Sequence, residues 1–244
     1  MRSLLIGWLA LLAFGAVPLR GDDQRECVVL LHGVAVGPWT MQRLASALEA
    51  AGYRTVNLGY ASRHRTLEQI AGEDLPAALR AHEVAAAPRL HFVTHSMGSL
   101  VVRLYLRDQR PANLGRVVML GPPNQGSAAA GAAARHSVLR WLIGVNLERL
   151  GTGPRAITRE LGAADFELGV IAGQSSINPL FNHVFTGPHD GAVAVEATTL
   201  AGMRDHLVVP YSHTLMLWRR AVIDLTLHFL RHGKFVTAES ADPK

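Results

Sequence analysis

The sequence predicts an α/β domain with a mostly parallel central sheet and helices on both faces of that sheet. From Arg25 onward, short apolar runs alternate with longer stretches of helical periodicity. Runs such as Cys27–Leu31 are apolar throughout, which is typical of strands that are buried on both faces. The 244 residues, 49% of them apolar and 18% charged, exclude a disordered chain and suffice for one sizeable core.

The alternation is regular in the first half of the chain. Buried strands are expected at Cys27–Leu31, Arg54–Leu58, Leu90–Thr94 and Arg116–Leu120. Helices are expected between them, at Trp39–Ala51, Thr66–Ala86 and Met97–Asp108. Gly52 and Pro88 follow the first two of these helices and stop them.

The pattern loosens after Gly121. Residues 126–134 are almost all small, residues 136–150 look helical, and Gly151-Thr-Gly-Pro154 breaks that helix. We therefore expect residues 127–160 to form a small cap insertion over one edge of the sheet. The elements expected beyond it are strands at Phe166–Ala172 and Leu207–Val209 and an amphipathic helix at Thr214–Arg231. Without a repeat or a long linker, residues 23–236 are predicted to be one α/β domain, followed by a C-terminal tail at 237–244.

The N-terminus has the pattern of an export signal. A short positive start, Met1-Arg2-Ser3, precedes the uncharged apolar run Leu4–Pro18, which is too short to span a bilayer comfortably. Residues 1–22 are interpreted as a signal peptide, and the protein is expected to be periplasmic or secreted. Because no clean Ala-x-Ala follows, an uncleaved N-terminal anchor is the alternative.

The charge, the cysteine content and the absence of certain motifs limit which partners, cofactors and crosslinks the sequence allows. The formal net charge is +5, but Lys and Arg are scattered, which argues against nucleic acid and leaves peripheral contact with a membrane open. Cys27 is the one cysteine, so an intramolecular disulfide is excluded. The sequence has no G-x-G-x-x-G, no P-loop and no H-E-x-x-H, and we expect neither a cofactor nor a metal. The oligomeric state stays open.

The strongest chemical signal lies between an apolar strand and a helix, at Val93–Gly98. A serine on a tight strand-to-helix turn needs small neighbours, because the turn is strained. Gly98 fills one flanking position, and Thr94 stands where glycine is more common. Such a turn points the hydroxyl at the helix N-terminus, whose dipole favours negative charge. We interpret Ser96 as a nucleophile, with a helix-capping serine as the alternative.

A second motif, Leu30–Val34, ends the first strong strand. Acyl transfer to a serine passes through a tetrahedral oxyanion, which needs two preorganised backbone N–H donors. Met97, directly after the nucleophile, is the first predicted donor of this oxyanion hole. Val34 is the second, because Gly33 lets the backbone approach closely.

Three residues beside these donors are candidates for substrate binding. They are His32, Gly33 and His95. His32 lies too early in the chain to be a catalytic base, and we favour a structural role for it in orienting the loop.

Together these motifs resemble those of the bacterial lipase/esterase branch of the α/β-hydrolase superfamily. The resemblance rests on the His-Gly loop, the Thr-His-Ser-Met-Gly turn and Gly121-Pro-Pro-Asn-Gln-Gly-Ser127, and it covers about Cys27 to Leu230 in element order. The chain is also similar to the catalytic domain of the GPI inositol-deacylase-like hydrolases. The resemblance implies an α/β-hydrolase fold and a Ser, Asp, His order of catalytic residues along the chain.

Asp190 is the acid that this resemblance implies. It lies in Gly187-Pro-His-Asp-Gly191 before Val193, an Asp-Gly-x-Val context that these lipases use. The alternative is a turn aspartate, since Asp-Gly favours turns. Asp165 precedes its strand and so falls at the wrong edge of a parallel sheet. The weaker candidates are Asp205 and Glu196.

Two of the twelve histidines compete for the base. His213 lies in Pro210–Thr214, between the short strand Leu207–Val209 and the terminal helix, where this fold places its base. His206 precedes that strand and is expected at the opposite edge of the sheet, far from Ser96. A histidine that caps the terminal helix is the alternative role for His213.

The sequence therefore predicts a serine hydrolase of carboxylic esters, an esterase or lipase, with a small ester or lipid as substrate. A triad of Ser96, Asp190 and His213 would act through an acyl-enzyme. The alternatives are a thioesterase, an amidase or an acyltransferase on the same scaffold. A non-catalytic binding module is a further alternative, which the presence of all three triad members disfavours.

Overall fold

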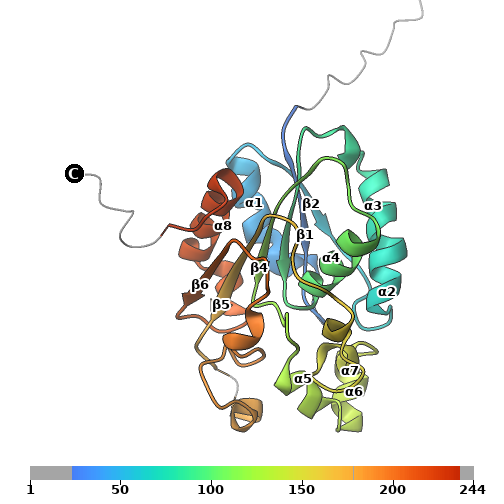
Figure 1. Ribbon diagram of the computed structural model, residues 1–244, viewed down its shortest axis with the longest axis vertical. Coiled ribbons are helices and arrows are strands. Elements are labelled where there is room, and N and C mark those ends of the chain that lie inside the picture. The colour runs from blue at the N-terminus through green and yellow to red at the C-terminus, as the bar shows by residue number, and fades with distance from the viewer. Residues whose placement is uncertain (1–23, 178, 237–244) are drawn as a thin grey trace, which may run out of the picture.

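A parallel sheet is the centre of the fold (Figure 1). The computed structural model describes residues 24–177 and 179–236, and within them the sheet has six strands in the order β2-β1-β3-β4-β5-β6. Every neighbouring pair is parallel. The strands are β1 (Cys27–Leu31), β2 (Arg54–Leu58), β3 (Leu90–His95), β4 (Leu114–Leu120), β5 (Leu168–Gly173) and β6 (Asp205–Val209). The mostly parallel sheet predicted from the apolar runs is confirmed.

Two predictions concern residues outside this description. The signal peptide at 1–22 and the tail at 237–244 lie beyond residues 24–236 and stay predictions. Within residues 24–177 and 179–236, no helix combines the length and the apolar character that a membrane span requires.

Helices cover both faces of the sheet (Figure 1). Side chains alternate between the faces along each strand, so that Val29 and Leu31 of β1 pack in one cluster and Leu30 packs in the other. The first cluster includes residues of α2 (Leu67–Gln69), α3 (Leu75–Ala81) and α4 (Met97–Asp108). The second includes residues of α1 (Gln42–Ala50) and α8 (Arg220–His232).

Three predicted helices outside the cap are interrupted. The first begins with a 3₁₀ turn at Pro38–Met41 before α1, and the last is split at Arg219 into a 3₁₀ turn, Leu215–Trp218, and α8. The helix predicted at Thr66–Ala86 is divided into α2, a π-helical turn at Ile70–Asp74, α3 and a 3₁₀ turn at Val84–Ala86. The π-helical turn is wider than an α-helical turn. Pro76 explains its presence, because proline has no N–H to donate to the carbonyl four residues earlier.

Residues 127–160, which we call the cap, contain three short helices at one end of the sheet (Figure 1). They are α5 (Ala128–Ala133), α6 (Ser137–Ile143) and α7 (Leu147–Leu150). The single helix expected over residues 136–150 is thus two helices, separated at Gly144. Gly144 has a φ of +105° and lies so close to the backbone of Arg63 that a β-carbon would collide with it.

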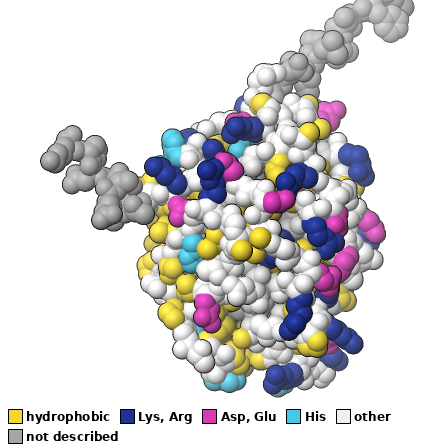
Figure 2. All heavy atoms as spheres, viewed as in Figure 1, with side chains coloured by type: hydrophobic (Ala, Val, Ile, Leu, Met, Phe, Trp, Pro, Cys, Tyr) yellow, Lys and Arg dark blue, Asp and Glu magenta, His cyan; other side chains and the backbone are white. Residues whose placement is uncertain are grey.

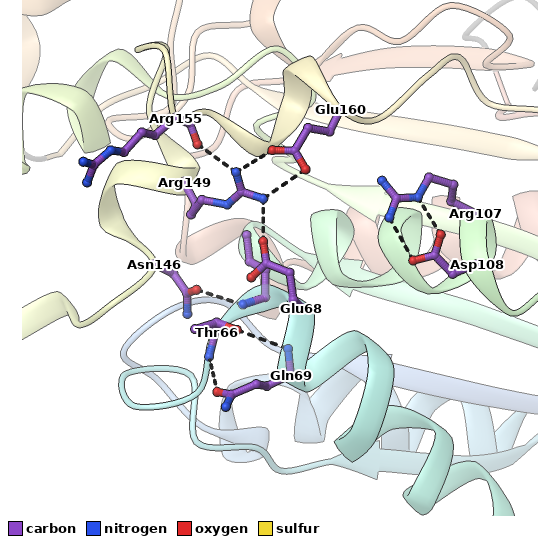
Figure 3. Close-up of polar contacts among 10 residues, drawn as sticks. Thr66, Glu68, Gln69, Arg107, Asp108, Asn146, Arg149, Arg155 and Glu160 are labelled. Atoms are coloured by element: carbon purple, nitrogen blue, oxygen red, sulfur yellow. Dashed lines mark hydrogen bonds and ion pairs between the residues drawn. The ribbon is translucent and has the colours of Figure 1, made fainter.

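Polar contacts attach the cap to the rest of the domain. Arg149 binds Glu68 of α2 and, within the cap, Glu160, and the buried Asn146 accepts a hydrogen bond from the backbone N–H of Leu67 (Figure 3). Behind the cap, Arg103 of α4 donates to the carbonyl oxygens of Asn124, Leu161 and Gly162, which flank the cap in the sequence. Burial lowers the pKa of Arg103 to about 10, so the guanidinium stays charged at neutral pH.

On the face shown in Figure 2, Lys and Arg side chains are interspersed with Asp and Glu. The scattering of charge along the sequence is therefore retained on this face of the folded molecule.

Replacement of Gly169 by alanine tests the packing of α8 on the sheet. A β-carbon at Gly169 would lie 2.6 Å from the ring of the fully buried Phe229. Overpacking of this kind costs about 1–3 kcal/mol, so Gly169→Ala should lower the free energy of unfolding in urea by that amount. Gly72→Ala, where a β-carbon meets nothing within 4 Å, is the matched control and should not destabilise the protein. Equal unfolding free energies for the two variants would contradict the packing.

Candidate active site

Ser96 stands on a strained turn between β3 and α4. Its backbone has a φ of 52° and a ψ of −121°, in the left-handed half of conformational space that side chains rarely adopt. Gly98 makes the turn fit, because a β-carbon there would lie 2.7 Å from the carbonyl oxygen of Leu31 and 2.8 Å from that of His32. The hydroxyls of Thr94 and Ser99 are hydrogen-bonded at 2.8 Å beneath the turn. Thr94 thus occupies the position where glycine was expected without disturbing the turn.

Asp190 and His213, 23 residues apart, form a closely bonded pair. Oδ2 of Asp190 lies 2.6 Å from Nδ1 of His213, and the backbone N–H of His213 donates to the carbonyl oxygen of Asp190 at 2.9 Å. The other carboxylate oxygen accepts from the backbone N–H groups of Ala192 and Val193 at 2.9 and 2.8 Å. The carboxylate is held by three donors, and it fixes the ring orientation of His213.

The environment of Asp190 favours its ionised form. Burial, at 1% exposure, raises the pKa of the carboxyl group. The charge and hydrogen bond of His213 and the N–H groups of Val193 and Ala192 outweigh that effect, and the pKa lies below its usual range. Asp190 is therefore a carboxylate at neutral pH.

His95 packs directly against this pair. Its ring centroid lies 4.7 Å from that of His213, and Nε2 lies 3.0 Å from the carbonyl oxygen of His213. Since a carbonyl only accepts hydrogen bonds, Nε2 carries the proton and donates it. Burial, reinforced by the charge of His213, lowers the pKa of His95 to about 3, so the ring is neutral. His95 supports the backbone of His213, and its Nδ1 is buried without a partner among the described residues.

The loop after β1 passes close to Ser96. A β-carbon on Gly33 would lie 2.9 Å from Nδ1 of His95 and 3.3 Å from the β-carbon of Ser96, so only glycine fits there. Nδ1 of His32 donates to the carbonyl oxygen of Gly33 at 2.8 Å, and burial lowers the pKa of His32 despite that bond. His32 is fully buried, contacts its own loop and is not among the residues that line the cavity at Ser96.

An apolar cavity of about 220 Å³ opens at these residues. Ser96, His95 and His213 line one part of it, together with Gly33 and Val34. The cap contributes an aliphatic part of the wall, which includes Ala129, Ala133, Ile143 and Leu147. The cavity therefore joins the polar groups at the carboxyl ends of the strands to an aliphatic surface.

The other acidic candidates lie elsewhere. Asp165 is exposed and paired with Arg110 before β5, and Glu196 is exposed in a 3₁₀ turn. Asp205 is the first residue of β6, where it accepts from the backbone N–H of Phe235. Asp190 is the carboxylate that is hydrogen-bonded to the His213 ring, whereas these three are exposed or bonded to other partners.

His206 lies inside β6 and not before it. The strand begins two residues earlier than predicted, and His206 is paired in register with Val170 of β5. Its Nε2 is hydrogen-bonded to the hydroxyl of Thr198 at 2.8 Å. The boundary of the strand was wrong, but His206 lies near the amino end of β6, away from the carboxyl end that His213 follows.

Two residues near this site were not anticipated. The ring of Tyr60 stacks on His32 at 4.1 Å, and its hydroxyl donates to the backbone carbonyl of His32. Ser62 accepts a hydrogen bond from the backbone N–H of Ala35. Both lie in an irregular loop after β2, where no periodicity or motif marks them. Among the described residues, no group of three His, Cys, Asp or Glu side chains could hold a metal ion.

Comparisons with known proteins assign the fold. No family model matches the sequence, and no curated protein matches it either. Among solved structures, the mature lipase BlEst2 of Bacillus licheniformis is similar with a TM-score of 0.62 and 19% identity, over 85% of this chain and 90% of that one. The Staphylococcus hyicus lipase is similar with a TM-score of 0.61 and 12% identity, over 88% and 96%. This chain has the α/β-hydrolase fold.

A third structure covers a smaller share. Phospholipase PlaB of Legionella pneumophila has a TM-score of 0.58 and 23% identity, over 71% of this chain and 44% of that one. In the α/β-hydrolase fold the carboxyl ends of the parallel strands carry the reactive groups. Here Ser96 directly follows β3 and His213 follows β6, with Asp190 hydrogen-bonded to His213.

The low pKa of His95 predicts a dependence of stability on pH. The unfolded imidazole binds a proton below about pH 6.5 and the folded one only near pH 3, so this stability is present above pH 6.5 and is lost as the pH falls. Between pH 7 and pH 5 the loss from His95 should be about 2 kcal/mol. Urea unfolding at both pH values should show a smaller loss in His95→Gln than in the wild type. An equal loss would contradict a buried, neutral His95.

Proposed function

We propose that this protein is a serine hydrolase that cleaves carboxylic esters, an esterase or lipase. The observation that carries the proposal is that His213, hydrogen-bonded to the buried Asp190, lines one cavity with Ser96, a serine held in left-handed backbone geometry. Such a serine with a hydrogen-bonded His–Asp pair is the arrangement that nucleophilic catalysis requires. The similar solved structures are lipases and a phospholipase by name, in agreement with this chemistry.

The proposed reaction begins with His213. Because its Nδ1 proton is held by the Asp190 carboxylate, Nε2 keeps the lone pair that removes the proton of the Ser96 hydroxyl. The Ser96 oxygen attacks the ester carbonyl, and the alcohol leaves with the proton from His213. Water, deprotonated in turn by His213, then releases the acid from the acyl-enzyme and restores Ser96.

The N–H groups of Met97 and Val34 are the proposed oxyanion donors. Met97 is the first residue of α4, where a backbone N–H has no acceptor within the helix. Val34 lines the cavity beside Gly33 and Ser96. Two such donors would stabilise the negative charge that develops on the carbonyl oxygen.

The cavity supports an acyl chain as the group that the site recognises. Its cap wall is aliphatic, with Ala129, Ala133, Ile143 and Leu147 beyond the nucleophile. The same site could serve a thioesterase, an amidase or an acyltransferase, and no observation favours one of these over ester hydrolysis.

Ester hydrolysis should depend on Ser96 and His213 but not on His206. In an assay with p-nitrophenyl esters, Ser96→Ala and His213→Ala should each lower kcat by at least about a thousandfold. His206→Ala removes a histidine from the same strand region and should change kcat little. Fluorophosphonate labelling should disappear in Ser96→Ala, and hydrolysis that survived in this folded variant would refute the proposal.

We also propose peripheral contact with a lipid surface through α6. This helix has no buried residue, and its side chains Val138, Trp141 and Leu142 are 66%, 73% and 45% exposed. Ile143, at its end, lines the cavity. Figure 2 shows basic side chains at the end of the molecule where the cap lies. Exposed apolar and basic side chains together favour an anionic bilayer surface.

Co-sedimentation with vesicles of phosphatidylcholine and phosphatidylglycerol tests this contact. The double variant Val138→Ser/Trp141→Ser should lose most of the vesicle-bound fraction, because it removes two exposed apolar side chains. Val208→Ser, at an exposed valine of β6, is the matched control and should bind as the wild type does. Equal binding of the double variant and the control would exclude α6 as the contact.

A further inference from the structure

The loop at residues 60–67 lies between two parts of the molecule that the sequence separates widely. On one side it contacts the loop at residues 32–35, which carries the proposed donor Val34. On the other side it contacts the cap at residues 141–146. The loop at residues 60–67 can therefore influence how the backbone of Val34 is held.

The two peptide groups that flank Val34 are each held by a side chain. Nδ1 of His32 donates to the carbonyl oxygen of Gly33, and in a planar trans peptide the N–H of Val34 then points the opposite way. The next peptide is held by Ser62, whose Oγ accepts from the N–H of Ala35 at 3.1 Å. Ala35 has a φ of 58°, a left-handed conformation that an alanine adopts only when its surroundings impose it.

The loop at residues 60–67 contributes to both restraints, through Tyr60 on His32 and through Ser62 directly. Tyr60 stacks on His32 with the ring planes 8° apart, and its hydroxyl donates to the carbonyl of His32. Ser62 is 3% exposed, so water has little access to replace its bond to Ala35. The direction of the Val34 N–H therefore depends on where this loop lies.

Asn146 of the cap holds the loop in place. It is fully buried and uses both ends of its amide: Oδ1 accepts from the N–H of Leu67 at 2.9 Å (Figure 3), and Nδ2 donates to the carbonyls of Ser62 and Arg65 at 3.1 and 2.8 Å. One cap residue thus bonds three backbone groups of the loop, one of them in Ser62 itself.

We infer that Ser62 is a positioning residue for the oxyanion hole and that Asn146 couples the cap to it. Neither residue touches the reacting atoms. Ser62 acts through the Ala35 peptide, and Asn146 acts through Ser62. The inference rests on the proposed function, because it concerns the stabilisation of an oxyanion at the same site.

Ser62→Ala tests the first step. It removes the acceptor for Ala35 and leaves the nucleophile, the base and the cavity wall intact. Loss of one direct oxyanion donor costs about 100- to 1,000-fold in kcat, and a displaced donor should cost about 10- to 100-fold, with KM nearly unchanged. An alkyl boronic acid, which forms a tetrahedral anion on the serine, should bind more weakly by a similar factor. A merely structural defect would lower the fraction of active enzyme but not this affinity.

Asn146→Ala tests the coupling, with Asn113→Ala as the matched control. Asn113 also donates from Nδ2 to two backbone carbonyls, those of Val84 and Ala87, but it lies beside the amino end of β4. Asn146→Ala should weaken boronic acid binding, and its effect should not add to that of Ser62→Ala, because both act on one peptide. Asn113→Ala should lower Tm and leave the boronic acid affinity unchanged.

The outcomes separate this inference from the proposed function. Wild-type boronic acid affinity and kcat in Ser62→Ala, with an inactive Ser96→Ala, would overturn the positioning role alone. Effects of Asn146→Ala and Ser62→Ala that simply add, or equal effects of Asn146→Ala and Asn113→Ala, would overturn the coupling. Should Asn146→Ala fail to fold, Asn146→Ser is measured in its place against the same control. Full activity in Ser96→Ala would instead refute the proposed function.

Discussion

The left-handed backbone at Ser96 is the constraint around which the site is built. A non-glycine residue in this conformation costs about 1–3 kcal/mol, and it persists only where the surrounding packing imposes it. Gly98 lets the start of α4 approach the carbonyls that end β1, and Gly33 lets the loop after β1 pass beside Ser96. The parallel sheet supplies the frame, since β1 and β3 are neighbours and both end at this edge. The strained conformation of Ser96 is thus maintained by packing against the buried ends of β1 and β3.

The charges around Ser96 follow from burial and from backbone donors. Asp190 is buried, yet it remains ionised because two N–H groups and His213 surround its oxygens. His95, in contrast, is uncharged. It is buried beside His213 and donates a hydrogen bond to the backbone. Two adjacent histidines therefore differ in role because one faces a carboxylate and the other a carbonyl.

The cap combines a firmly attached part with an exposed part. Asn146 and Arg149 tie α7 to α2 and to the loop before it, and Arg103 holds the backbone on both sides of the cap. By contrast, α6 has no buried side chain. The firm contacts thus lie at α7 and the loop at residues 60–67, whereas α6 carries exposed apolar side chains and ends at Ile143, which lines the cavity. The hydrogen bonds that attach the cap to the domain consequently also contribute to the geometry of the site.

The sequence alone predicted the parallel sheet, the strand-to-helix turn at Ser96 and the pairing of Asp190 with His213. Strands such as Cys27–Leu31 and the turn at Val93–Gly98 are visible because apolar periodicity and small flanking residues act over a few neighbouring positions. Tertiary structure decided the breaks at Gly144 and Arg219, the start of β6, and the bonds of Tyr60, Ser62 and Asn146. Those bonds join residues 27 to 84 positions apart through backbone groups, which every residue carries, and so they leave no pattern in the sequence.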